Sequence, residues 1–393
     1  MAKGINAMFG YVEAMPTLDL AMPTALFLAV LVALFLSKRV ENKLTETVEQ
    51  KEFKTRDVLL LVGFILVVVS VIAYTSIVNP GGIFENAILI FFMGSYTTLL
   101  FTFSYVFSNA TKPRVQLVSA GFGVAAIIGG VVSLLGPLGD AFTIYRAIAF
   151  FALAGFCFGV VLFEQKKVST GKGRWYVAAQ PPALFLLLFI FFNVIYGGAT
   201  QVWNPVLLDV FGFTFAILII MYLSSLFTWK TVGLFAVLLT FMDIFLVFSG
   251  PMVTAAETFT GLGLPVLVYL PNIPIVLTEA GKITFRGLGL GDFFFAGILA
   301  VQTFNKFGKK TAVISVFAMA LSFGIWEAYL PEITSYFDIG GFPATVCIIT
   351  GWIPIVVYMW LTTRNKIMPP PPPPPPPSTT PVAEIANEAD PSN

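Results

Sequence analysis

Eleven apolar stretches, each long enough to cross a bilayer as a helix, follow one another along this chain of 393 residues. A helix needs about 20 residues to span roughly 30 Å of hydrocarbon. Only 11% of the residues are charged, whereas soluble domains carry about a quarter. We therefore predict an all-α polytopic membrane protein, with spans at 18–37, 58–78, 83–108, 115–137, 142–163, 178–197, 206–229, 231–250, 285–305, 311–330 and 341–363.

Lysine and arginine are distributed unevenly over the loops between these stretches. When the loops are assigned alternately to the two sides of the membrane, eighteen of the 22 basic residues fall on one side. Since basic loops stay in the cytoplasm, we predict an N-terminus outside and a C-terminus in the cytoplasm. The first stretch has no basic segment before it, so we expect a retained helix rather than a cleaved signal.

The chain contains no histidine, which excludes a Ser–His dyad and an HExxH zinc site. Its two cysteines, Cys157 and Cys347, lie within different spans and are expected to be apolar packing residues. We accordingly predict no metal, no cofactor and no nucleic-acid partner. The lipid bilayer is an expected partner, and the sequence leaves a homo-oligomer open.

Two further segments have distinctive compositions. Nine consecutive prolines (369–377) predict a polyproline II rod of ~28 Å, at about 3.1 Å per residue, followed by a disordered acidic tail. This part is expected to be a spacer, with docking of a proline-binding partner as the alternative. The apolar, proline-broken segment 251–284 is expected either to lie on the membrane surface or to fold inward as a gate.

Two aspartates interrupt apolar stretches, Asp243 in 231–250 and Asp292 in 285–305. An ionisable side chain at membrane depth is costly, so such a pair indicates a working site. At a rise of about 1.5 Å per residue, both lie ~10 Å below the outer surface on consecutive antiparallel helices. Close carboxyls cannot both be charged cheaply, so one is expected to activate water while the other protonates or hydrogen-bonds a scissile carbonyl.

Gly287, Gly289 and Gly291 precede the second aspartate. Without side chains they allow close backbone approach and a local departure from helix, so this backbone can hold an unwound substrate by strand-like pairing. Glycines in membrane helices also serve packing, and paired acids also serve proton or ion pathways in transporters. On spacing alone, protease, transporter and structural roles all stay open.

Three passages occur in one order along the chain: Phe241–Phe248 with Met242-Asp243, Gly289-Leu290-Gly291-Asp292, and Pro343-Ala344-Thr345. They resemble, in turn, the Tyr-Asp, GxGD and PAL motifs of the presenilin and signal peptide peptidase family of intramembrane aspartyl proteases. The segments 204–229 and 252–265 look more like the signal peptide peptidase branch. The chain departs from the motifs twice, with methionine in place of tyrosine and threonine in place of leucine.

The resemblance implies a presenilin-like helical bundle of about nine core transmembrane helices, in which Asp243 and Asp292 are catalytic. It implies a substrate that is itself a transmembrane helix, such as a signal peptide remnant or a type II membrane protein. The residues expected to contact this substrate are Met242, Gly289, Leu290, Gly291, Pro343, Ala344 and Thr345.

The aspartates fall in the eighth and ninth of eleven stretches, whereas the family carries them in the sixth and seventh of nine helices. We therefore expect two extra N-terminal helices, 18–37 and 58–78. The predicted division of the chain is a hairpin at 1–81, the N-terminal helices of the protease fold at 82–203, the catalytic helices at 204–366 and a tail at 367–393.

The leading hypothesis is an intramembrane aspartyl endopeptidase, and the alternative is a proton- or cation-coupled transporter using the same acids. The absence of an evident inverted repeat favours the protease. A third hypothesis is a catalytically silent relative that binds substrate. Of the other polar residues, Asp209 and Glu327 are expected to be structural or interfacial, and Arg146 to reach the surface or to pair with Asp140.

Overall fold

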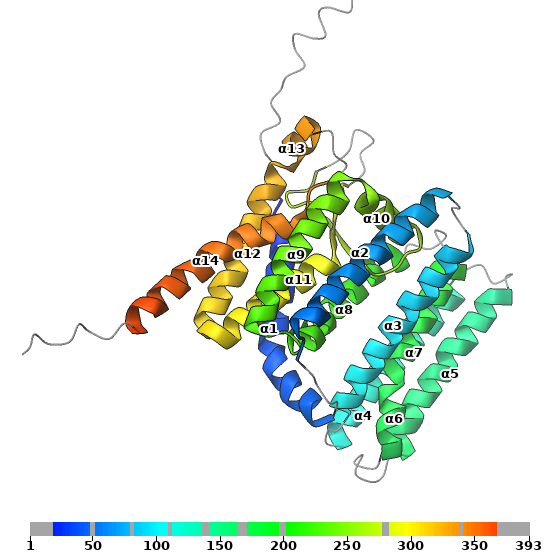
Figure 1. Ribbon diagram of the computed structural model, residues 1–393. Helices are drawn as coiled ribbons and strands as arrows, with labels where there is room; N and C mark the ends of the chain where they lie inside the picture. Colours follow the sequence, from blue (N-terminus) through cyan, green and yellow to red (C-terminus); the bar gives the residue numbers. More distant parts are fainter. Residues whose placement is uncertain are drawn as a thin grey trace, which may run out of the picture.

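The computed structural model describes residues 19–47, 52–78, 82–108, 112–135, 141–163, 171–195, 202–276, 283–337 and 341–367, and most of them are helical (Figure 1). The elements in chain order are α1 (Ala21–Thr47), α2 (Thr55–Val78), α3 (Ile83–Phe107), α4 (Lys112–Leu134), α5 (Ala141–Phe163), α6 (Gly171–Ala178), α7 (Gln180–Phe189), the π-helices η1 (Ile190–Ile195) and η2 (Trp203–Leu207), α8 (Leu208–Ser224), α9 (Trp229–Phe248), α10 (Pro251–Gly261), β1 (Leu267–Pro271), β2 (Phe285–Gly289), α11 (Leu290–Phe307), α12 (Lys309–Ala328), α13 (Leu330–Phe337) and α14 (Ala344–Ile367). The prolines at 369–377 lie outside the described residues.

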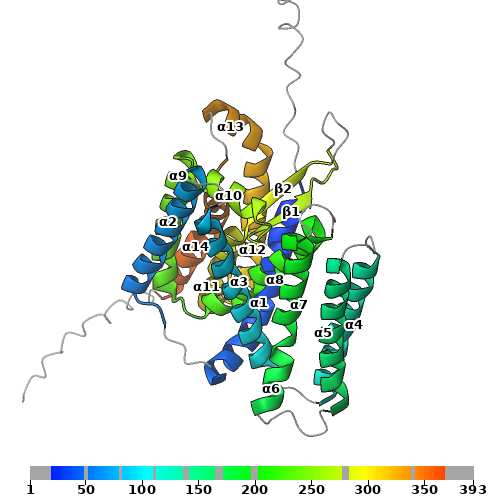
Figure 2. The same ribbon diagram turned by 90° about the vertical axis from the view of Figure 1, so that its right-hand side faces the viewer.

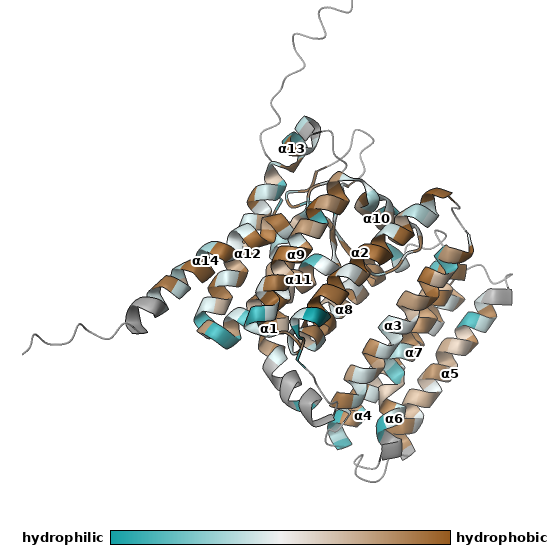
Figure 3. Ribbon diagram, viewed as in Figure 1, coloured by the Kyte–Doolittle hydropathy of each residue, from teal (hydrophilic) through white to brown (hydrophobic). Residues whose placement is uncertain are grey.

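Nine helical segments among these residues are long and apolar enough to cross a membrane, and they correspond to nine of the eleven predicted stretches. Hydrophobic residues predominate along most of the helices (Figure 3). Many large apolar side chains are exposed, including those of Phe64, Ile90 and Phe241. Such a surface suits lipid rather than water. The prediction of an all-α, multi-pass integral membrane protein is confirmed.

The two remaining stretches differ from the prediction in instructive ways. In the first helix the apolar part is short, Ala21–Ser37, and the helix continues as a polar segment to Thr47. In the second, the predicted helix at 285–305 is wrong over its first five residues, which form strand β2. Glycine is a poor helix former, and these residues pair with β1 instead.

Helix α11 is the centre of the bundle. Every residue from Phe293 to Thr303 is buried. Helices α1, α8, α12 and α14 pack against α11, and α9 contacts it as well. This helix is held on most of its sides, which fixes the position of the aspartate near its first turn.

Helices α4 and α5 form a hairpin at one edge of the molecule (Figure 2). Glycines allow the two helices to approach closely, because a Cβ on Gly129 would lie 2.8 Å from the ring of Phe150. The hairpin packs mainly on α6 and α7, whereas α1 packs on α8, α11 and α12, and α2 on α9 and α10. The four-part division of the chain stays a prediction, but its N-terminal helices are not set apart from the catalytic ones.

The segment after α9 contains a short helix and a strand. Helix α10 is followed by β1, which pairs antiparallel with β2 in the register Leu267↔Gly289 to Pro271↔Phe285. Both views place α10, α13 and the two strands towards the same end of the molecule (Figures 1 and 2). The antiparallel pairing brings a segment about 20 residues away in the chain beside the start of α11.

Close packing of α12 on α14 generates a first prediction. A Cβ on Gly351 would collide with the backbone carbonyl oxygen of Ala318, and backbone cannot move aside as a side chain can. We expect Gly351→Ala to lower the stability by about 1–3 kcal/mol, as overpacking does. Thermal unfolding in detergent measures the effect. Gly155→Ala, at a helix position with open space around it, is the control and should not lower the melting temperature.

Candidate active site

The first aspartate, Asp243, lies near the C-terminal end of α9, which begins at a capping box formed by Thr228 and Thr231. Its side chain is only 6% exposed. Its Oδ2 accepts a hydrogen bond of 2.6 Å from the hydroxyl of Thr345 and one of 3.4 Å from the backbone N–H of the same residue. Thr345 lies in the first turn of α14, where backbone N–H groups lack partners within the helix. The PAL-like segment therefore contacts the aspartate directly.

The second aspartate, Asp292, is the third residue of α11, whose N-cap is Gly289. Its carboxyl accepts a hydrogen bond from the backbone N–H of Gly289. This is the reverse half of a capping box, in which an acid at the third helical position satisfies the N-cap amide. A Cβ on Gly289 would lie 3.1 Å from Oδ2 of Asp292. Glycine therefore gives the carboxyl room to fold back over the strand end.

The two carboxyls lie close enough to interact electrostatically, and each also interacts with Cys347 of α14. Helices α9, α11 and α14 contact one another in pairs. Three chain segments far apart in sequence thus meet at the aspartates. The structure places the two acids within range of electrostatic interaction, while their action as a pair and their catalytic roles stay a prediction.

Strand β2 leads directly into this site, and no described strand pairs with its edge opposite β1. Leu290 donates its backbone N–H to the carbonyl of Val266 at 2.9 Å, just beyond the paired strands. In an antiparallel pair, alternate residues direct their amide groups towards and away from the partner. The backbone groups of Gly287 and Gly289 therefore face away from β1, and the N–H of Gly289 is the one that Asp292 binds.

A cavity of about 450 Å³ lies between β2, the end of α12, α13 and the start of α14. Its wall contains Ala344 and Cys347 beside the aspartates, and Arg286 and Glu327 further away. The last two form an ion pair at 3.0 Å, with Glu327 only 7% exposed. The rest of the lining is mainly apolar. The cavity thus joins the strand, the PAL-like segment and the surroundings of the acids.

The other residues predicted to touch substrate lie around the same site in different environments. Met242 packs against the apolar cluster between α2, α9 and α10. Leu290 is buried, whereas Gly291 is exposed with open space around it. Pro343 accepts a backbone hydrogen bond in the first turn of α14, and Ala344 lines the cavity. Their contact with a substrate stays a prediction.

Three polar residues outside the motifs have definite partners. Asp209 accepts a hydrogen bond of 2.6 Å from the backbone N–H of Tyr269 in β1, which is a structural role as expected. Glu327 was expected near an interface and instead is buried in its ion pair with Arg286. Arg146 is 2% exposed and donates to a backbone carbonyl of α4, so it does not reach the surface. Asp140 lies outside the described residues.

No group of three or more His, Cys, Asp or Glu side chains that could hold a metal ion occurs within the described parts of the chain. Both cysteines are buried and unbridged. The groups that the described residues place at the site are two carboxyls, the hydroxyl of Thr345, the thiol of Cys347 and a strand edge.

Comparison of the sequence with models of protein families identifies the family of this chain. The model of the signal peptide peptidase family matches residues 45–337, a span that contains both aspartates and ends before the PAL-like segment. The chain therefore belongs to the signal peptide peptidase family, which confirms the resemblance, and it is a membrane-embedded peptidase of the intramembrane aspartyl class. Searches of curated proteins and of solved structures found no match.

The contact between α14 and Asp243 yields a second prediction. Thr345→Val keeps the shape of the side chain but removes the hydroxyl that donates to Oδ2. Hydrogen bonds to charged groups contribute about 1.5–3 kcal/mol, so cleavage of a model helical substrate should slow roughly 10- to 100-fold. Thr345→Ser retains the hydroxyl and should stay close to wild type. Equal rates for the valine and serine variants would show that this hydrogen bond does not matter for the reaction.

Proposed function

We propose that this chain is an intramembrane aspartyl endopeptidase in which Asp243 and Asp292 act together on a peptide bond inside a transmembrane helix. The observation that carries the proposal is the meeting of two acids, from α9 and α11, at the end of a strand with an unpaired edge. Substrates of this class are signal peptide remnants and type II membrane proteins.

The proposed reaction needs one proton shared by the pair. The ionised carboxyl takes a proton from water as the water oxygen attacks the scissile carbonyl carbon. The protonated carboxyl hydrogen-bonds the carbonyl oxygen, and a proton passes to the leaving nitrogen as the C–N bond breaks. Thr345 holds the carboxyl of Asp243, and Gly289 holds that of Asp292, so both are oriented before substrate arrives.

A helical substrate must unwind before its peptide bond can be attacked, because helical hydrogen bonds occupy the backbone. The outward-facing backbone groups of Gly287 offer an unwound segment new partners through strand addition. The neighbouring cavity, with Arg286 and Ala344 in its wall, provides space for substrate side chains on one face of that strand. Together they support a substrate that lies extended beside β2 and crosses the acids.

The aspartate assignment gives a third prediction. Asp243→Ala and Asp292→Ala should each abolish cleavage of a labelled signal-peptide-like helix by the purified protein in detergent, since neither acid alone can act as both base and acid. Glu257→Gln, on the exposed face of α10, removes a carboxylate away from the site and should leave cleavage intact. Cleavage by either alanine variant refutes the assignment. Ion-dependent flux into liposomes without proteolysis would favour the transporter.

The orientation in the membrane gives a fourth prediction. Eighteen of 22 basic residues fall on the side that the alternation assigns to the cytoplasm. A peptide tag after Asn393 should therefore resist protease added outside intact cells and be digested after permeabilisation. A tag before Met1 should be digested in intact cells. The opposite pattern would place the acids nearer the cytoplasmic surface and change which end of a substrate enters first.

A further inference from the structure

The strand pair has a second edge, on β1, which we call the β1 edge: the outward-facing backbone of Leu267, Tyr269, Pro271 and Ile273. Asn272 donates its N–H to Thr284 at 3.2 Å, so even-numbered residues face β2 and odd-numbered ones face away. Unpaired strand edges recruit other strands. The state of the β1 edge therefore decides where an extended peptide can bind.

Groups from α8 and from the two residues just before α1 close the β1 edge. The N–H of Tyr269 is bound by Asp209 of α8 at 2.6 Å. The N–H of Ile273 is bound by Asp19 at 2.8 Å, and its carbonyl accepts the N–H of Leu20 at 2.9 Å. Proline at 271 has no N–H to offer. The N–H groups of Tyr269 and Ile273 are thus both already hydrogen-bonded within the protein.

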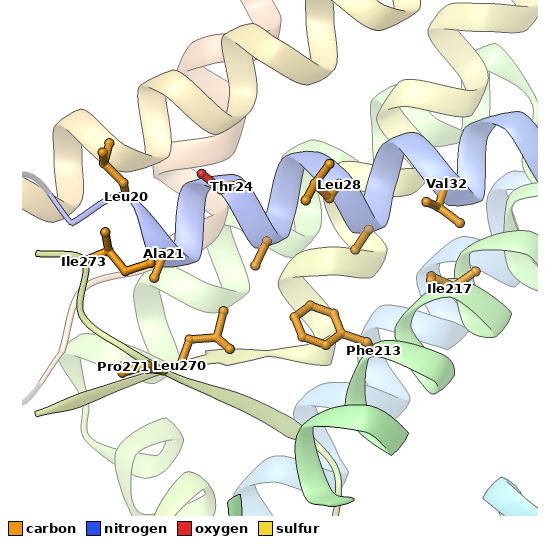
Figure 4. A pocket seen from close by; sticks show the side chains of 12 residues that line it. Leu20, Ala21, Thr24, Leu28, Val32, Phe213, Ile217, Leu270, Pro271 and Ile273 are labelled. Atoms are coloured by element: carbon orange, nitrogen blue, oxygen red, sulfur yellow. The ribbon is translucent and has the colours of Figure 1, made fainter. Parts of the chain in front are cut away.

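The space beyond the β1 edge is also unsuited to a strand. Beside Leu267, the first residue of the β1 edge, α8 approaches closely: a Cβ on Gly212 would lie 3.3 Å from the carbonyl oxygen of Leu267. At its other end, the start of α1 runs beside Leu270, Pro271 and Ile273 across a cavity of about 600 Å³ (Figure 4). Nearly all of the side chains that line this cavity are apolar. Thr24 is the polar exception, so this lining offers a peptide backbone few hydrogen-bond partners.

Asp209 binds β1 in the middle of its paired residues, at Tyr269. Tyr269, whose N–H it binds, lies opposite Gly287, and a Cβ there would lie 2.8 Å from the tyrosine ring. The hydroxyl of Tyr269 forms a hydrogen bond of 2.6 Å with Thr260 of α10. The backbone of Tyr269 is therefore fixed by α8 and its side chain by α10. Tyr269 lies two residues from Leu267, which pairs with Gly289 just before Asp292.

We infer that Asp209 is a positioning residue that sets which peptide bond of the substrate is cut, an inference that rests on the proposed function. Asp209 anchors β1 to α8. Strand β1 in turn fixes the position of β2 through their antiparallel pairing. Strand β2 then positions the substrate strand relative to Asp292. Side chains on a strand alternate with a period of two, so a slip by two residues keeps the faces matched. Without the anchor, neighbouring registers become accessible and the cut is spread over several bonds.

The test compares Asp209→Ala with Asp209→Asn. Alanine removes the acceptor for the N–H of Tyr269, whereas the amide oxygen of asparagine still accepts it. Thr214→Ala is the matched control, because it removes a hydrogen bond made within α8 to Val210. The purified full-length proteins are incubated with a labelled signal-peptide-like helix, and mass spectrometry measures the share of product from each bond.

In the wild type, one peptide bond gives the largest share of product. We expect this share to fall by at least about half in Asp209→Ala, with the difference appearing at neighbouring bonds. Asp209→Asn and Thr214→Ala should keep the wild-type pattern. An unchanged pattern in Asp209→Ala overturns the inference, and so does an equal change in Asp209→Asn. If Asp209→Ala does not fold, Asp19→Ala against Asp19→Asn applies the same comparison at Ile273. A wild-type protein that cuts nothing, or cuts without its two active-site acids, instead refutes the proposed function.

Discussion

A backbone amide inside a membrane protein must find its hydrogen-bond partner within the protein, because lipid supplies none. Helices meet this requirement by themselves, but the β1–β2 pair does not, since each strand has an outer edge. One edge is closed by Asp209, Asp19 and the start of α1. On the other edge, the N–H of Gly289 is taken by the carboxyl of Asp292, and the backbone of Gly287 faces away from β1. Under the proposed function, this asymmetry directs an incoming peptide backbone to the side where the acids lie.

The acids depend on helices that meet only in the folded protein. Asp243 is held by Thr345 from α14, and α14 lies close to α12 because Gly351 has no side chain. The departure from the PAL motif thus has a local explanation, since leucine could not donate a hydrogen bond to Oδ2. Sequence comparison alone presents Thr345 as a lost motif residue, whereas its position beside the carboxyl makes it a supporting contact.

The two helices that the sequence predicts as additional, α1 and α2, are packed into the bundle. The chain has two more predicted spans than the nine of its family, and their order in sequence suggests that the first two are the extra ones. In the structure, however, α1 and α2 pack on the helices that carry the acids, whereas α4 and α5 form the peripheral hairpin. That the first two helices are the added pair stays a prediction, and the bond from Asp19 to Ile273 connects the residues just before α1 to the strand pair.

Hydropathy and motif order in the sequence determined the helical membrane fold, nine of its spans and the family, because apolar length and residue spacing are local properties. They also single out the two aspartates as the candidate catalytic residues. The strand at 285–289, the contact of Thr345 with Asp243 and the binding of Asp209 to Tyr269 could not be predicted that way. Each joins segments separated by about 20 to 100 residues. Only the packing of α8, α9, α11 and α14 decides which backbone groups of the strand pair are bound within the protein, and these groups carry the proposal of where a substrate strand binds.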